Sequence, residues 1–292
     1  MELGNQYSED NDFKRLARKY QSLYRSEILK VDYNEYGNRL TEPDAWNRNL
    51  NYFQKLNVTE ELRKRYPNYS SLRDADMLRS EHIPFNFFAP LKLEEDITLK
   101  YFNGILKTKF KEINKIEFEY APKRKENYLN DATSFDTYLE FTTDANETVG
   151  VGIEMKYTEG PYEIGATEKR QINNSDSKYN TVTKACQRFT NPDVQKFIGN
   201  DIRQMWRNHI LGESMRLKNE LSNFYSITIF PKANDHLENA LPKYKDLLKK
   251  ECRNRVIGIH FGDYIAFLKR TKLYKEEKYK EWIDYLDKRY LF

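Results

Sequence analysis

Several features that stabilise small secreted or metal-bound domains are missing from this sequence. It has only two cysteines, Cys186 and Cys252, and no CxxC spacing, which excludes a disulfide framework and a zinc finger. No apolar run approaches the ~20 residues that a transmembrane helix needs. The first residues contain no apolar segment of a secretory signal. These absences predict a cytoplasmic protein with reduced cysteines.

The chain does contain enough apolar material for a large core. Its 292 residues are 39% hydrophobic and 14% aromatic, which excludes a disordered chain. A chain of this size buries about three quarters of its unfolded surface, so a core forms without a metal or disulfide. The formal net charge of +4 permits contact with nucleic acid but does not require it.

Hydrophobic periodicity divides the chain into a helical first part and a mixed remainder. We expect residues 1–77 to form a helical accessory region and residues 78–292 to form the main core. In the first part, one helix is predicted over residues 9–30. A second is predicted to begin with Thr59 as its N-cap and to end before Pro67.

The main core has the pattern of an α/β or α+β fold, a mixed central sheet flanked by helices. Its expected elements are a helix over 94–110, strands over 115–120, 133–143 and 147–159, a helix over 201–220 capped by Asp201, a strand over 224–230, a helix over 237–250, a strand over 255–261 and terminal helices. The turn-like residues 144–147 predict a β-hairpin. The Asn-, Ser- and Lys-rich stretch before residue 201 is predicted to be a loop.

The predicted hairpin carries charged residues in otherwise apolar strands. Asp136 lies on its first strand, and Glu154 and Lys156 share one face of the second. Gly150 and Gly152 share that face and are expected to leave room for a bulky group. Burying such charges among apolar residues costs free energy unless a bound group compensates them. Two carboxylates suit Mg²⁺, and a lysine would position or deprotonate a water or stabilise charge, which predicts metal-assisted phosphodiester hydrolysis.

The hairpin also resembles a known family. SFDTYLEF and GIEMKYTE, joined by the turn, are similar to the PD-(D/E)XK nuclease superfamily. In this resemblance Asp136 is the acid of the first strand and Glu154-Met155-Lys156 is the (D/E)XK half-motif, while Phe135 replaces the proline. The segments RSEHIPFNFFAPL, FEYAP and DIRQMWRNHIL extend the likeness to a group of bacterial restriction endonucleases.

The resemblance implies a restriction-endonuclease-like core that cleaves double-stranded DNA with Mg²⁺, using Asp136, Glu154 and Lys156 as catalytic residues. It also suggests Glu81 as a further metal ligand, because many members place a helical Glu or Gln near the metal. Glu159 is expected to line the same pocket. Because cutting both strands is simplest with two symmetric sites, we expect a homodimer.

Two further groups are candidates for DNA contact or for support of the site. On the predicted helix over 201–220, Gln204, Arg207 and Asn208 are expected to reach phosphates or the active site, while His209 is expected in the core. A short basic run between two predicted strands is expected to contact the DNA backbone. This run is Lys123, Arg124 and Lys125.

Each of these interpretations has a structural alternative. Glu154 and Lys156 are alternatively a surface pair on a solvated strand face. Asp136 is alternatively a turn or cross-strand partner of Lys156, and Glu81 a helix-terminus charge or a local hydrogen-bond partner. The polar face of the helix over 201–220 and the basic run are alternatively solvated surfaces. At the level of function, the rivals are a non-catalytic DNA- or partner-binding protein and a nuclease for RNA or branched DNA.

Overall fold

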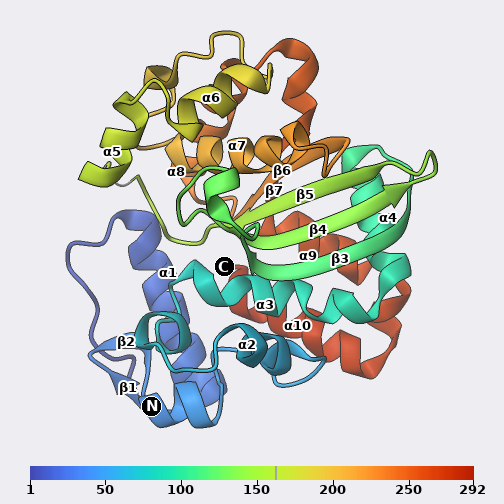
Figure 1. Ribbon diagram of the computed structural model, residues 1–292. Helices are drawn as coiled ribbons and strands as arrows, with labels where there is room; N and C mark the ends of the chain where they lie inside the picture. The colour runs from blue at the N-terminus through green and yellow to red at the C-terminus, as the bar shows by residue number, and fades with distance from the viewer. Residues whose placement is uncertain (162) are drawn as a thin grey trace.

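The computed structural model describes residues 1–161 and 163–292, and a mixed β-sheet lies at its centre (Figure 1). Within the described residues this sheet has five strands in the order β3 (Phe110–Tyr120), β4 (Phe135–Thr143), β5 (Thr148–Met155), β6 (Asn223–Phe230) and β7 (Val256–His260). The first three strands are antiparallel, and β6 and β7 run parallel to β5. A small ribbon of β1 (Tyr33–Asn34) and β2 (Tyr36–Leu40) lies apart.

Helices surround the sheet. The α-helices are α1 (Asp12–Leu23), α2 (Val58–Arg65), α3 (Ile83–Phe88), α4 (Glu95–Leu106), α5 (Ala166–Asn173), α6 (Lys178–Ala185), α7 (Arg203–Leu217), α8 (Asp235–Asp246), α9 (Phe261–Lys269) and α10 (Glu277–Tyr290). Shorter 3₁₀ or π turns are η1 (Tyr24–Leu29), η2 (Pro43–Asn47), η3 (Ser71–Ala75), η4 (Ser80–His82), η5 (Pro90–Leu93), η6 (Lys125–Asn127), η7 (Val194–Lys196), η8 (Lys250–Arg255) and η9 (Lys272–Lys275).

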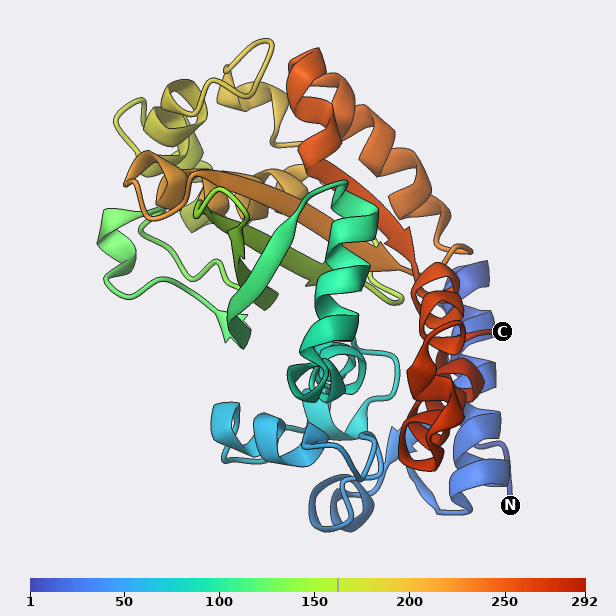
Figure 2. The ribbon, with the colours of Figure 1, turned by 90° about the vertical axis from the view of Figure 1, so that its right-hand side faces the viewer.

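Each face of the sheet has its own hydrophobic core. Val151, Ile153 and Met155 of β5 face the core that includes residues of α3, α4, α9 and α10. The opposite face belongs to a second core with residues of α6, α7 and α8, in which Phe135 and Phe224 take part. Figures 1 and 2 show these two groups of helices on opposite sides of the sheet. The predicted fold class, a mixed sheet flanked by helices, is confirmed.

The stretch predicted as a polar loop contains two helices, α5 and α6, so that prediction is wrong. Each helix has only eight residues and a few apolar positions, too few for a clear periodic signal. Ile172, Tyr179 and Val182 are buried in the same core as Trp206 of α7. Tertiary packing, rather than local propensity, therefore stabilises these two helices.

Two predicted helix caps are also wrong. Helix α2 begins at Val58, with Asn57 as its N-cap in a left-handed conformation (φ 64°), so Thr59 lies inside the helix. Helix α7 begins two residues after Asp201. The N-cap is Ile202, without a side-chain cap hydrogen bond, and the Asp201 carboxylate lies 3.1 Å from Nζ of Lys243 on α8.

The space beside the two glycines of β5 is filled by the protein itself, contrary to the expectation of an open approach. A Cβ at Gly152 would lie 2.5 Å from the ring of Phe135 and 2.8 Å from Phe224. At Gly150 it would lie 2.7 Å from Leu221. The absence of a side chain at these positions admits apolar side chains of the second core, not a ligand.

The N-terminal region packs against the rest of the chain. Tyr20 of α1 donates to the carbonyl of Lys288 on α10 at 2.7 Å, and Gln21 donates to the hydroxyl of Tyr157 at 2.8 Å. Val58 of α2 belongs to the core beneath the sheet. The division of the chain at residue 77 stays a prediction. None of the helices in the described residues has both the length and the apolar character needed to cross a membrane.

Candidate active site

The hairpin brings the predicted catalytic residues to one end of the sheet. Thr137 of β4 pairs with Ile153 of β5, which places Asp136 beside the end of β5. Glu154 is the next-to-last residue of β5, and Lys156 follows directly after the strand. The backbone N–H of Met155 donates to Oδ2 of Asp136 at 2.6 Å, which fixes this carboxylate against the (D/E)XK segment.

Three donors surround the Glu154 carboxylate, which belongs to a residue only 7% exposed. Nζ of Lys156 lies 2.7 Å from Oε1. Gln204 also donates to Oε1, and Nδ2 of Asn208 donates to Oε2 at 2.5 Å. Because Gln204 and Asn208 are four residues apart, they share the face of α7 that points at β5. The helix therefore holds Glu154 in one orientation.

Lys156 is a charged donor in this arrangement. Its backbone N–H donates to the carbonyl of Ile229 on β6 at 2.9 Å, so its position is fixed although β5 has ended. Burial alone lowers the pKa of Lys156, but the carboxylates of Glu154, Glu159 and Asp136 outweigh this effect, and the net pKa is raised. The side chain therefore carries a positive charge at neutral pH.

Asp136 lies in a strongly negative environment. Burial raises the pKa of this carboxyl well above its usual range, and the nearby Glu154 and Glu119 carboxylates raise it further. Lys156 and the N–H of Met155 oppose this shift without cancelling it. A site that gathers carboxylates in this way holds excess negative charge that a cation would neutralise.

Glu119 is a neighbour of the site that the sequence analysis did not identify. Phe118 pairs with Thr137 and Tyr120 with Phe135, so Glu119 lies alongside Asp136. Its backbone has a φ of 49°, a left-handed conformation inside a strand. The one signal in the sequence was that Glu119 is a charged residue on a strand expected next to the hairpin. The sequence does not specify the register between this strand and the strand of Asp136.

We expect the metal-free protein to lose stability as pH rises between about 4.5 and about 7, in part through Glu119. Burial, followed by the charge of Glu154, raises the pKa of Glu119 from 4.5 to about 7. The folded state therefore favours the protonated form, and this contribution is full below pH 4.5 and lost as pH rises through 7. In EDTA, Glu119→Gln should flatten the dependence of Tm on pH and raise Tm at pH 7.5.

Glu117→Gln is the matched control, because Glu117 lies on the same strand but is exposed. It removes the same charge and should leave the pH dependence of Tm as in the wild type. If Glu119→Gln and Glu117→Gln behave alike, the carboxylate of Glu119 is not destabilised by its neighbours.

Glu81 and Glu159 lie close to the site but have protein partners. Glu81 pairs with Arg79, Oε1 to Nη2 at 2.7 Å, while its charge also raises the pKa of Glu119. Glu159 accepts backbone N–H groups through both oxygens, from Ser80 at 2.9 Å and from Tyr157 at 2.7 Å. The turn η4 is thereby connected to the segment that follows Lys156.

Arg207 lies on α7 but points to a different set of residues from Gln204 and Asn208. Its guanidinium donates to Oδ2 of Asp131 at 3.0 Å and to Thr133 at 2.8 Å, and it lies 3.4 Å from Glu168 of α5. His209, on the same helix, is fully buried, and its Nδ1 lies 2.8 Å from the hydroxyl of Tyr244, as expected for a core histidine. Burial lowers the pKa of His209 to about 4.

The basic run lies on the surface, in the connection between β3 and β4. Arg124 has a left-handed backbone (φ 59°), and the turn η6 begins at the next residue. All three side chains of the basic run are exposed. These are Lys123, Arg124 and Lys125.

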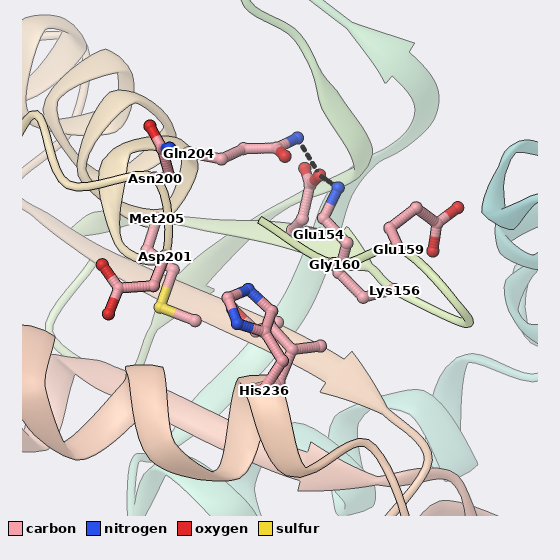
Figure 3. A pocket seen from close by; sticks show the side chains of 11 residues that line it. Glu154, Lys156, Glu159, Gly160, Asn200, Asp201, Gln204, Met205 and His236 are labelled. Atoms are coloured by element: carbon pink, nitrogen blue, oxygen red, sulfur yellow. Dashed lines mark hydrogen bonds and ion pairs between the residues drawn. The ribbon is translucent and has the colours of Figure 1, made fainter. Parts of the chain in front are cut away.

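A pocket opens beside Glu154 and Lys156 (Figure 3). Gln204 of α7 and Glu159 also line it, and His236 at the start of α8 faces Lys156 from another wall. His236 was not identified from the sequence, because only the packing of α8 against the sheet brings it here. Asp136 is not among the residues that line this pocket.

The donors at the hairpin fit a hard divalent cation. Asp136 and Glu154 supply carboxylate oxygens, the ligand type that Mg²⁺ prefers, and the surplus negative charge around Asp136 favours a cation. Within the described residues, no group of three or more His, Cys, Asp or Glu side chains is arranged to hold a metal. A cation here would therefore rely on these two carboxylates, with water and substrate oxygens completing its coordination, as is common for Mg²⁺.

Comparison with known proteins identifies the family of the chain. The model of the PD-(D/E)XK nuclease superfamily matches residues 8–292, which is nearly the whole chain and includes most of the N-terminal region. No curated protein and no solved structure gives a significant match. The resemblance found in the hairpin sequence is thus confirmed, and the chain belongs to the PD-(D/E)XK nuclease superfamily.

Proposed function

We propose that this protein is a Mg²⁺-dependent endonuclease of the restriction type, which hydrolyses phosphodiester bonds in double-stranded DNA. The observation that carries the proposal lies at the end of the hairpin: the Lys156 ammonium contacts the Glu154 carboxylate, and the Asp136 carboxylate, held by the N–H of Met155, interacts electrostatically with both. Members of this superfamily are usually nucleases that act on nucleic acid and use divalent metal ions.

In the proposed reaction, water attacks phosphorus and the bond to a nucleoside oxygen breaks. The attacking water loses a proton to solvent, and the leaving oxygen gains one to become a hydroxyl. Asp136 and Glu154 would hold the cation, which supplies Lewis acidity and lowers the pKa of bound water. Lys156 would act as a donor, since its raised pKa keeps it protonated. It would orient the attacking water or stabilise charge on the phosphoryl oxygens, and the role of base is left to solvent.

The surrounding residues have supporting roles in this proposal. Gln204 and Asn208 would keep Glu154 oriented towards the cation, acting through their hydrogen bonds to its carboxylate. The exposed residues Lys123, Arg124 and Lys125 would contact the DNA backbone. Arg207 would act at a distance by tying α7 to Asp131 and α5. Glu81 remains a candidate for a further ligand, provided that it exchanges Arg79 for the cation.

Two properties of the whole protein belong to the same proposal. A homodimer would present two equivalent sites to the two strands of the duplex. A cytoplasmic location is supported by the two cysteines, Cys186 and Cys252, which are both buried and unpaired.

We expect the purified protein to convert supercoiled plasmid and long duplex DNA to linear fragments in Mg²⁺. EDTA should stop this cleavage. A set of unmethylated DNAs of varied sequence is needed, because a restriction enzyme cuts only where its recognition sequence occurs. Ca²⁺ in place of Mg²⁺ should permit binding with little cleavage.

The same assay separates the rival functions. Binding that does not depend on a metal, with no cleavage of any duplex in Mg²⁺ or Mn²⁺, would establish a non-catalytic binding protein instead. Cleavage confined to RNA or to branched DNA would keep the nuclease chemistry and reject the substrate proposed here.

A further inference from the structure

His236 is placed next to the proposed catalytic residues by two hydrogen bonds. It lies in the first turn of α8, after Asn234, which caps this helix by accepting the N–H of Leu237 at 3.3 Å. Nδ2 of Asn234 also donates to the carbonyl of Tyr157 at 3.0 Å. Because Tyr157 directly follows Lys156, the start of α8 and the (D/E)XK segment are held together, and the wall that carries His236 is fixed relative to Lys156.

The imidazole of His236 is available to a ligand. Its ring nitrogens make no hydrogen bond or ion pair with any residue that the structure describes. The other histidines differ: His209 contacts Tyr244, His260 contacts Glu238, and His82 is fully buried between aromatic rings. His236 is only partly buried and its ring is directed into the pocket (Figure 3).

Burial in the pocket wall favours the neutral form of this imidazole. Burial lowers the pKa of His236, Lys243 and Lys156 lower it further, and Asp201 opposes them. A neutral imidazole offers one N–H donor and one acceptor nitrogen.

The negative charges that line the pocket already have partners. The Asp201 carboxylate pairs with Lys243 at 3.1 Å, and both Glu159 oxygens accept backbone N–H groups. Donors that face the pocket from different walls thus include the ammonium of Lys156, which has further N–H groups besides the one directed at Glu154, and a ring N–H of His236.

We propose that His236 is a substrate-binding residue of this site, donating a hydrogen bond to a phosphate oxygen of DNA held between it and Lys156. A phosphate diester fits these surroundings because its anionic oxygens accept hydrogen bonds both from an ammonium and from a neutral N–H. The inference rests on the proposed function, since it assigns the phosphate of the nuclease substrate to this pocket. It adds a residue of α8 that lies outside the (D/E)XK hairpin.

The test is the affinity for duplex DNA in Ca²⁺, measured by fluorescence anisotropy at pH 7.5. The DNA is a fragment that the wild type cleaves in Mg²⁺. If the wild type cleaves none, any duplex that it binds is used. His236→Ala should weaken binding about tenfold, the effect of losing one hydrogen bond to a charged group. One of the two amide variants, His236→Gln or His236→Asn, should recover most of the affinity, because each amide supplies an N–H at the position of a different ring nitrogen and only one ring nitrogen donates. The slope of affinity against salt should stay unchanged, because a neutral side chain releases no counterion.

His260→Ala is the control, because His260 pairs with Glu238 and lies outside this pocket. Its affinity should match the wild type, and the Tm of each variant verifies folding. The inference is overturned if His236→Ala binds like the wild type, or if the folded amide variants bind as weakly as His236→Ala. If the wild type binds DNA without cleaving it, the proposed hydrolysis is rejected but the His236 contact can still be measured. If the wild type binds no duplex in Ca²⁺, both the proposed function and the His236 contact are rejected.

Discussion

Lys156→Ala should reduce the rate of DNA cleavage in Mg²⁺ by about a hundredfold to a thousandfold, the usual effect of removing one positioned donor from a developing charge. The ammonium of Lys156 lies against Glu154 and carries a positive charge at neutral pH, so alanine removes both the donor and the charge. Initial rates of plasmid linearisation under single-turnover conditions measure this change directly.

The control for this variant is Lys232→Ala. Lys232 is an exposed lysine that follows β6 closely, as Lys156 follows β5, but it does not line the site pocket. Its cleavage rate should equal that of the wild type. Because Gln204 and Asn208 still bind Glu154 when Lys156 is absent, Lys156→Ala should also fold. Cleavage at the wild-type rate by folded Lys156→Ala would remove this lysine from the mechanism.

Asp136→Asn should have opposite effects on activity and on stability. Cleavage in Mg²⁺ should fall about a thousandfold, because the neutral amide is a poor ligand and the Lewis acid is worth several kcal/mol to the reaction. In EDTA at neutral pH the variant should melt at a higher temperature than the wild type. The pKa of Asp136 is raised by burial and by its carboxylate neighbours, so the ionised form destabilises the metal-free fold.

The increase of Tm upon adding Ca²⁺ gives a readout that does not depend on cleavage. A ligand that binds only the folded state raises its stability, so the wild type should gain Tm with Ca²⁺ and Asp136→Asn should gain little. Asp144→Asn is the matched control, since Asp144 lies exposed in the turn of the same hairpin. An equal Tm gain in Asp136→Asn and in the wild type would show that Asp136 does not hold the cation.

The hairpin with the candidate catalytic residues was predictable because its information is local. Alternating apolar residues specify two strands, a short polar turn joins them, and Asp136, Glu154 and Lys156 lie within 21 residues of one another. Helix α7 was predictable for the same reason, since the spacing of Gln204 and Asn208 puts them on one face whatever the helix packs against. That this face meets Glu154 depends on the position of the helix over the sheet.

The parts of the site that were missed come from long-range packing. Glu119 lies near Asp136 because of the β3–β4 register and a left-handed backbone, and neither is encoded in a short pattern. His236 faces Lys156 only because Asn234 connects α8 to Tyr157. The glycines of β5 suggested an open face, and only the tertiary structure reveals that Phe135 and Phe224 fill it.

The sequence by itself determined the absence of a disulfide framework, the existence of a charged hairpin with the (D/E)XK pattern and the mixed α/β class. These properties follow from composition and from short-range periodicity, which hold whatever the rest of the chain does. Tertiary structure alone decided which polar groups meet: Asp136 with Glu119, Glu154 with Gln204 and Asn208, and His236 opposite Lys156. The interaction energy of two polar groups depends on the distance between them and on their burial. For residues that are remote in sequence, both are set only when the chain packs into its fold.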